Sequence, residues 1–292
     1  MQILLPYKGM ETRAAQQLRF FPDLQNMKGV VFLAFLMVSC STVRIKTPPR
    51  SSSLTGTAYY KSLFASGWQQ RDSVTTAELL RGNMPAFLKR LVPIRVSAID
   101  SATGKKIKAV YFVTPDYLSV GTDADWARVH LTPGAAQKVA DSLHCFLPTT
   151  KMVDAIYHAA KLKLEPLPLF AHRDSTPTMY HHHLIIEGQR KGRKGLIAGI
   201  KKDLVITGRL HRDSRSNRVA IYGWHKPGGV PIQPLYTGHV NWWVDYSQGI
   251  RLVYRKIKMN GQWMDYTDVL KHPVYKNLIC NEEFCDYYRY PY

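Results

Sequence analysis

Apolar residues in the first half of the chain recur with helical spacing. Residues 75–92 carry apolar side chains three and four positions apart, and Gly82 and Pro85 weaken or split the expected helix. Residues 133–143 and 149–160 show the same spacing. In the first of these, proline occupies the first helical turn, where its missing N–H is not needed. These patterns predict three helical segments.

Short apolar runs and alternating patterns predict β-strands, which are more frequent in the second half. The strands are expected at residues 94–99, 107–113, 204–207, 219–224 and 250–255, the last with one solvated face. Asn260-Gly261 supplies a hairpin turn, and residues 268–278 form a short helix interrupted by Pro273. We therefore expect a single α+β domain, with helices mainly in the N-terminal half and an antiparallel or mixed sheet in the C-terminal half.

Residues 27–40 have the features of an export signal. They read MKGVVFLAFLMVSC, which combines a lysine, a ten-residue apolar stretch and a small residue before Cys40. The stretch is too short to span a membrane, which needs about 20 apolar residues. This order resembles a bacterial lipoprotein signal peptide, and the alternative is an ordinary buried helix at residues 29–38. The resemblance implies cleavage before Cys40, a lipid on its thiol, and an acyl chain such as palmitate on the new amine.

The signal divides the chain into segments with different expected roles. Residues 1–26 represent an early start or an extended n-region, and residues 27–39 are the signal peptide. Residues 40–57 hold the lipidated cysteine and a Pro- and Ser-rich stretch, which we expect to be a flexible tether. Residues 58–292 form the domain. No acidic cluster follows Cys40, so the resemblance to lipoproteins implies a lipid-anchored location on the periplasmic side of the outer membrane.

Composition and charge narrow the class of partner. Of 292 residues, 45% are hydrophobic and 21% charged, which is globular composition. Lys and Arg number 40 against 21 Asp and Glu, giving a formal net charge of +19. A basic protein of the cell envelope meets anionic lipid and acidic glycan, so we expect these partners, besides the membrane that holds the lipid anchor, and no nucleic acid.

The stretch from residue 222 to 245 contains the strongest candidate for chemistry. His225 closes an expected strand at a Gly/Pro turn, and His239 and Asp245 follow closely enough to share a pocket. An imidazole and a carboxylate can form an acid–base pair, or all three side chains can ligate a divalent metal such as zinc. The alternative is that both histidines are half-buried residues of a sheet.

Basic and aromatic residues near these histidines are candidates for substrate binding. Lys201, Lys202 and Arg251 would hold carboxylates, and Trp242 and Tyr246 would stack on sugar rings. The Gly-punctuated basic stretch at 190–203 could bind an anion, although it is neither a P-loop nor a dinucleotide fingerprint. The alternatives are a solvated basic loop and rings that belong to the core.

The remaining His and Cys residues give weaker signals. The triple histidine at 181–183 lacks the spacing and the Glu of an HExxH zinc site, and a polar surface tract is the alternative. Cys145 could be a nucleophile or a small buried residue. Cys280 and Cys285 can close a disulfide in an oxidising compartment.

Several segments resemble a family of secreted bacterial proteins of unknown function. They are FVTPDYLSVG (112–121), CFLPTTKMVDAIYHAAKLKLEP (145–166), AGIKKDLVI (198–206) and the stretch 220–255. The resemblance covers roughly residues 80–280 and implies a domain boundary but no activity. The family pattern has histidine at the position of Gln248, a His-Asn pair near 182–183, and histidine at the position of Ile200.

These observations support two hypotheses. The first is an envelope hydrolase acting on peptidoglycan or another anionic cell-surface polymer, either His/Asp-dependent or metal-dependent, with His225, His239 and Asp245 as its centre. The second is a non-catalytic lipoprotein that binds or scaffolds anionic envelope glycan through its basic and aromatic surface. Convergence of the three residues in one cleft would favour the first hypothesis.

Overall fold

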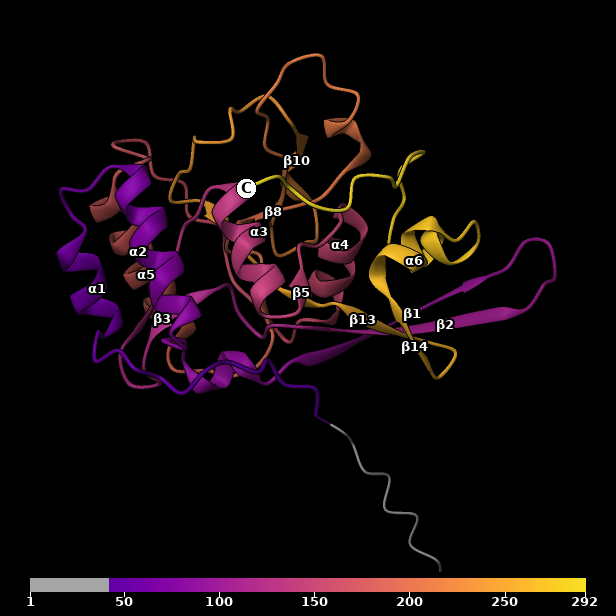
Figure 1. Cartoon of the computed structure of the whole chain (residues 1–292), viewed down its shortest axis with the longest axis horizontal. Helices are drawn as coiled ribbons and strands as arrows, with labels where there is room; N and C mark the ends of the chain where they lie inside the picture. Colours follow the sequence, from indigo (N-terminus) through magenta and orange to yellow (C-terminus); the bar gives the residue numbers. More distant parts are fainter. Residues whose placement is uncertain (1–41) are drawn as a thin grey trace, which may run out of the picture. The chain divides into compact units, whose positions relative to one another are not determined.

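The computed structural model describes residues 42–292, whose helices and strands give an α+β architecture (Figure 1). The expected signal peptide and Cys40 lie outside the described residues. The helices are α1 (Gly56–Ser62), α2 (Trp68–Leu80), α3 (Pro133–Ser142), α4 (Thr150–Ala159), α5 (Thr176–Arg190) and α6 (Tyr266–Lys271), with 3-10 turns at Ala86–Lys89, Gly208–Leu210 and Tyr275–Leu278. Most helical residues therefore precede the sheet-rich C-terminal half, as the sequence predicts.

Local sequence signals explain the helix ends. Proline occupies the start of α3, and the Thr149 side chain caps α4 by accepting a hydrogen bond from the Met152 N–H. The helix expected at 75–92 is split, because Gly82 adopts a φ of +78° after α2 has ended. Pro273 separates α6 from the last 3-10 turn in the same way.

The larger sheet has six strands. They are β1 (Val92–Ile99), β2 (Lys106–Val113), β5 (Cys145–Phe146), β12 (Val253–Tyr254), β13 (Lys256–Met259) and β14 (Gln262–Asp265). Their order is β14-β13-β2-β12-β5, with β1 paired to β2 along its whole length and all pairings antiparallel. Asn260 and Gly261 both have positive φ at the β13–β14 turn, which confirms the predicted hairpin.

A four-stranded sheet carries two residues of the candidate chemistry, Lys202 and His225. It contains β8 (Lys202–Leu204), β9 (Ile221–His225), β10 (Pro231–Tyr236) and β11 (Gln248–Gly249) in the order β10-β9-β8-β11. Only the β11–β8 pairing is parallel within this sheet. Two further two-stranded sheets pair β3 (Ser119–Gly121) with β4 (Trp126–Arg128) and β6 (Leu162–Lys163) with β7 (Ile197–Ala198).

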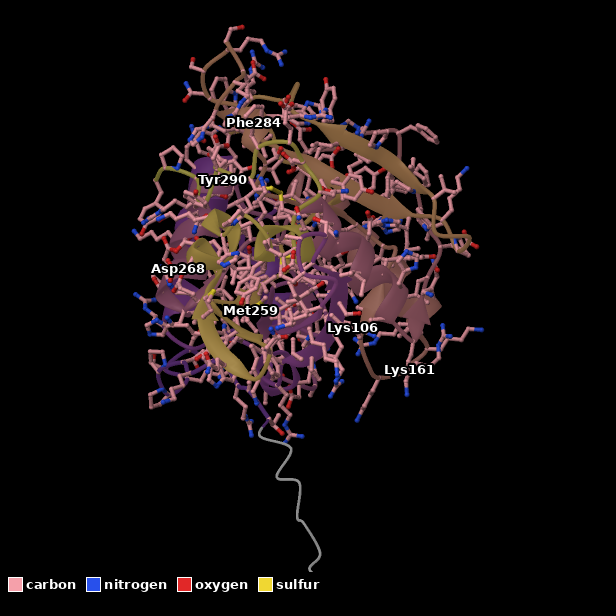
Figure 2. The ribbon with its side chains drawn as sticks, turned by 90° about the vertical axis from the view of Figure 1, so that its right-hand side faces the viewer. Lys106, Lys161, Met259, Asp268, Phe284 and Tyr290 are labelled. Carbon is pink, nitrogen blue, oxygen red and sulfur yellow. A yellow bond between two sulfur atoms is a disulfide. The ribbon has the colours of Figure 1, made fainter. Side chains whose placement is uncertain are left out.

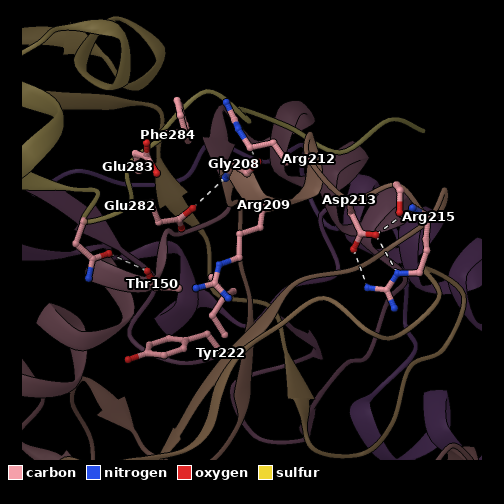
Figure 3. Close-up of a pocket in the computed structure, with 13 residues that line it drawn as sticks. Thr150, Gly208, Arg209, Arg212, Asp213, Arg215, Tyr222, Glu282, Glu283 and Phe284 are labelled. Carbon is pink, nitrogen blue, oxygen red and sulfur yellow. Dashed lines mark hydrogen bonds and ion pairs between the residues drawn. The ribbon is translucent and has the colours of Figure 1, made fainter.

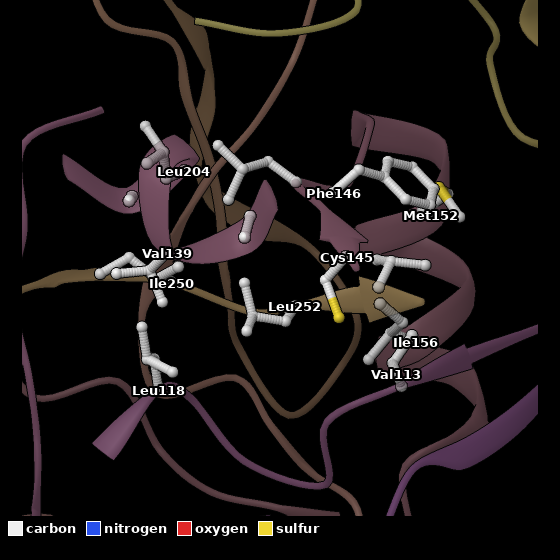
Figure 4. Close-up of a cluster of buried hydrophobic side chains, with 14 of the residues drawn as sticks. Val113, Leu118, Val139, Cys145, Phe146, Met152, Ile156, Leu204, Ile250 and Leu252 are labelled. Carbon is white, nitrogen blue, oxygen red and sulfur yellow. The ribbon is translucent and has the colours of Figure 1, made fainter. Parts of the chain in front are cut away.

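The main hydrophobic core lies where the larger sheet meets α3 and α4. Cys145, Phe146 and Leu252 are fully buried there (Figure 4). Burial raises the pKa of the Cys145 thiol far above its usual value. A thiol that stays protonated and has no access to solvent is a poor nucleophile, so Cys145 is a core residue.

Three sequence expectations need correction. The stretch expected as a tether is folded from residue 42 onward, since Ile45 is only 4% exposed and α1 begins at Gly56. Residues 250–253 are all buried rather than half solvated, because Arg251 donates to the Thr114 and Ile197 carbonyls while its apolar neighbours lie in the core. The triple histidine lies within α5 and is not a surface tract: His182 and His183 face the interior.

Candidate functional site

A cavity of about 260 Å³, which we call the Lys202 cavity, brings together basic, polar and aromatic side chains of the smaller sheet and its loops. Its lining residues are Arg173, Lys202, Gln233, Tyr236, His239 and Trp243. Two of them, Lys202 and His239, were expected from the sequence to take part in a site. The aromatic Trp242 is adjacent in sequence and 47% exposed, but it does not line the cavity.

Lys202 contributes an unpaired cation to this cavity. It begins β8, and its backbone N–H donates to the Ser247 carbonyl at 2.7 Å. Its ammonium lies 5.2 Å from the Trp224 ring centre and makes no hydrogen bond to any of residues 42–292. Burial and the nearby Arg173 lower the pKa of Lys202, while Asp245 opposes this shift. An ammonium with free donors beside a cavity is suited to an anionic ligand.

Asp245 holds Arg173, the second cation of the Lys202 cavity, in place. Its carboxylate is 1% exposed and accepts hydrogen bonds from Arg173 Nη2 at 2.8 Å and from the Ser247 N–H at 2.9 Å. The Arg173 side chain is 43% exposed, so its other donors remain available to solvent or a ligand. Asp245 therefore acts as a buried anchor for Arg173, and its own oxygens are occupied.

His239 completes the polar lining between two aromatic rings. The Tyr236 and Trp243 ring centres lie 5.1 Å and 6.2 Å from the imidazole. Its backbone carbonyl accepts from the Val219 N–H, which fixes the loop beside β9. Burial lowers the pKa of His239, and the charges of Lys202 and Arg173 lower it further, against the effect of Asp245. The imidazole is therefore neutral at neutral pH and gains charge in acid.

His225 lies in a different arrangement. Its Nε2 is 2.9 Å from Asp154 Oδ1 on α4, and its ring stacks on Tyr157 at 4.5 Å. The Tyr222 hydroxyl donates to the same Asp154 oxygen at 2.8 Å. Gly223 leaves room for this ring, since a Cβ there would lie 3.3 Å from His225 Cε1. Neither His239 nor Asp245 is a hydrogen-bond partner of His225.

The expected three-ligand metal arrangement of His225, His239 and Asp245 is absent from the described part of the chain. No group of three His, Cys, Asp or Glu side chains within residues 42–292 lies close enough to hold a metal ion. The physical reason is that each residue has another partner. His225 faces Asp154, Asp245 faces Arg173, and His239 lies between aromatic rings. These donors do not fit a zinc site.

Three residues expected to bind substrate are instead buried. Lys201 is 1% exposed, and its Nζ lies 3.0 Å from both His130 Nε2 and His182 Nδ1. Arg251 donates to the carbonyls of Thr114 and Ile197. The Tyr246 hydroxyl and the backbone of Leu169 are hydrogen-bonded to one another. These three side chains have a structural role, because groups within the protein already accept their hydrogen bonds.

The structure also contains a buried ionic network that no sequence pattern predicts. Arg128 is fully buried and makes a bidentate pair with Asp116 at 2.8 and 2.7 Å, and its Nη2 also contacts Glu187 at 2.8 Å. Arg190 lies 3.6 Å from Asp116. Despite burial, these arginines hold the pKa of Asp116 below its usual value. No spacing rule connects these residues, because they come together only through the packing of α5 on β4.

The loop closed by the disulfide lines a second cavity. Cys280 and Cys285, the pair expected from the sequence, are joined by a bond that closes a loop at residues 280–285. This loop forms one wall of a cavity of about 880 Å³ (Figure 3). Arg215 pairs with Asp213 there, and Arg212 pairs with Asp286. The carboxylates of Asp213, Glu282 and Glu283 also line this cavity, whereas no carboxylate lines the Lys202 cavity, so the Lys202 cavity makes the stronger case for binding an anion.

The comparisons with known proteins identify no relative. The chain matches no protein-family profile, no curated protein and no solved structure. Between residues 42 and 292, the helices all fall short of the length and apolar character needed to cross a bilayer. Inference about function therefore rests on the geometry of the Lys202 cavity.

Proposed function

We propose that the protein is a non-catalytic lipoprotein of the bacterial cell envelope that binds an anionic group of a cell-surface glycan in the Lys202 cavity. The observation that carries this proposal is the pair of cations, Lys202 and Arg173, beside Tyr236 and Trp243. The cations can bind a carboxylate, and the rings can contact the face of a sugar. The volume of about 260 Å³ suits one charged sugar residue rather than a longer chain.

Binding is favoured over hydrolysis by the partners of the polar groups. A hydrolase needs a base and an orienting or acidic group directed at the same reacting atom. Asp245 directs its oxygens to Arg173 and Ser247, and His225 directs Nε2 to Asp154. His239 is then the one member of the expected triad that lines the cavity.

The test compares two sugars that differ in one anionic group. N-acetylmuramic acid carries a carboxylate that N-acetylglucosamine lacks, so titration calorimetry should give tighter binding to the first. Lys202→Met should weaken that binding by about 10- to 100-fold, the range for a lost charged hydrogen bond. Lys226→Met is the matched control, because Lys226 is exposed on the neighbouring turn and does not line the cavity.

Two results would overturn the proposal. Equal affinity for the charged and neutral sugars would remove the role of the cations. Release of soluble fragments from peptidoglycan by the purified protein would restore the hydrolase hypothesis, and His225→Ala and His239→Ala would then identify its base.

A further inference from the structure

One face of the larger sheet is basic and exposed. Directly paired residues on neighbouring antiparallel strands project to the same face of a sheet. By this rule Arg95, Val110, Lys258 and Trp263 form one row across β1, β2, β13 and β14. The alternate residues, including Ile107 at 6% and Ile257 at 0% exposure, point into the core. The row therefore belongs to the side of the sheet that faces solvent.

Further cations extend this row into a surface, which we call the basic sheet face. Its cations are Arg95, Lys106, Lys108, Lys256 and Lys258. Lys106 lies on β2, next to the strand that carries Met259 (Figure 2). The carboxylate of Asp265 lies 3.4 Å from Lys256 Nζ and offsets one of these charges. The remaining cations make no ion pair with any of residues 42–292.

The basic sheet face also carries aromatic side chains at its edge. Trp263 is 49% exposed, and its ring centre lies 5.9 Å from Lys258 Nζ. With Tyr254 and Lys256 it lines a shallow cavity of about 360 Å³. Tryptophan and tyrosine prefer the interface between membrane and water, and lysine extends its charge to lipid headgroups. This combination is the chemistry of a membrane-contacting surface.

The start of the described chain lies on the same face. Val43 and Arg44 complete the lining of the cavity of about 360 Å³ that Trp263, Tyr254 and Lys256 border. The Val43 carbonyl accepts from the Leu91 N–H at 3.0 Å, and the Ile45 N–H donates to the Lys89 carbonyl at 2.9 Å. Cys40 precedes Val43 by three residues, a reach of at most about 11 Å. A lipid on Cys40 would therefore hold this face close to the bilayer.

We infer that the basic sheet face docks on a bilayer containing anionic phospholipid. Each lysine or arginine close to an anionic membrane raises the affinity about fivefold, so four unpaired cations give substantial affinity at low salt. Trp263 adds an interfacial contact that does not depend on charge. The docked domain holds the Lys202 cavity in a fixed orientation to the membrane. This inference extends the proposed envelope location and does not depend on the ligand of that cavity.

The test uses residues 42–292, which lack both the apolar stretch 29–38 and Cys40, so that vesicle binding reports the sheet face and not a signal peptide or an attached lipid. The probes are vesicles of phosphatidylcholine and of phosphatidylcholine mixed with phosphatidylglycerol. We expect co-sedimentation with the mixed vesicles only, and a decrease as salt is added. The triple variant Lys106→Glu, Lys108→Glu, Lys258→Glu should bind about a hundredfold or more weakly, and Trp263→Ala should also lose affinity.

A matched triple variant keeps the test falsifiable. Lys138→Glu, Lys161→Glu and Lys226→Glu change the net charge equally at exposed positions outside the sheet face. If both triple variants lose vesicle binding equally, the binding depends on the net charge of the protein and not on the sheet face, and the inference is overturned. Equal binding to both vesicle types, or none to either, would also overturn it. Retained vesicle binding by Lys202→Met would separate this surface from the proposed glycan site.

Discussion

Two neighbouring lysines show how much one strand position changes a side chain's environment. Lys201 directly precedes β8 and Lys202 is its first residue, and successive side chains of extended backbone project to opposite sides. The Lys201 ammonium is enclosed by His130 and His182, and burial with the charge of Arg128 strongly lowers its pKa. Lys202 reaches a cavity and keeps free donors. Only the second lysine is available to a ligand.

His239 should make ligand binding dependent on pH. Burial and the nearby cations keep its pKa below the usual value, so the imidazole is neutral at pH 7 and gains a positive charge as the pH falls. We expect the affinity for N-acetylmuramic acid to rise between neutral and mildly acidic pH, as long as the sugar carboxylate stays ionised. His239→Gln should abolish this rise and leave the affinity at pH 7 nearly unchanged. Calorimetric titrations across this range would check it, and an identical rise in the variant would contradict it.

Asp203 should make stability fall as pH rises. Burial raises its pKa to about 6, although Arg251 and the Tyr117 hydroxyl, which donates at 2.9 Å, oppose the shift. An unfolded aspartate titrates near about 3.9, so the folded state binds the extra proton between these values. The charged carboxylate then costs up to about 3 kcal/mol above pH 6, and this cost disappears as the pH falls towards 4.

Asp203→Asn removes this titration. The amide oxygen can still accept from Tyr117, so the variant should show a flatter dependence of the free energy of unfolding on pH between 4 and 6. Urea titrations at several pH values would measure it. Asp268→Asn is the control, because Asp268 is an exposed carboxylate in the first turn of α6, whereas Asp203 is buried. A decline of unchanged slope in Asp203→Asn would show that another group titrates.

At the scale of elements, residues 42–55 contribute more to the stability of the domain than their composition suggests. They pair with the 89–91 segment through Val43 and Ile45, and Thr55 caps α1 by accepting from the Ala58 N–H. Pro- and Ser-rich composition predicts a tether because no periodic apolar pattern is present. A single buried isoleucine and a few backbone hydrogen bonds are enough to attach the segment, but they leave no periodic signal.

Removal of this segment should therefore destabilise the domain. We expect a chain beginning at residue 56 to unfold about 5–10 °C below one beginning at residue 42, since burying one isoleucine and one helix cap together contribute roughly 2–4 kcal/mol. Circular dichroism melts would measure the difference. Ile45→Ala in the longer chain should account for about half of the loss. Identical melting temperatures would mean that the segment adds nothing to the fold.

At the scale of the whole molecule, the proposed location in the cell envelope depends on whether Cys40 carries a lipid. If the resemblance to a lipoprotein signal holds, intact-mass analysis of membrane-extracted protein should give a chain that starts at Cys40 and carries two or three acyl groups. Cys40→Ala should instead leave the uncleaved chain without lipid. Recovery of unmodified protein that begins at Met1 would contradict the prediction and leave the basic sheet face as the remaining link to a membrane.

The sequence alone predicted the features that local physics determines. The β1–β2 pair, the Asn260-Gly261 hairpin, α3 and α4 follow from periodicity, turn residues and caps, which act within a few residues. The α+β class follows from the order of these elements. The helix α5 was not predicted, because its interior is rich in histidine and polar residues with low helix propensity.

The tertiary structure decided which polar residues can meet a ligand. Arg173, which no sequence pattern selects, reaches the Lys202 cavity because Asp245 holds it there across a loop. His225 and His239 are close in sequence, yet one bonds to α4 and the other lines the cavity. A histidine or lysine has the same chemistry wherever it occurs. Its burial, partners and charge depend on long-range packing, which no local pattern encodes.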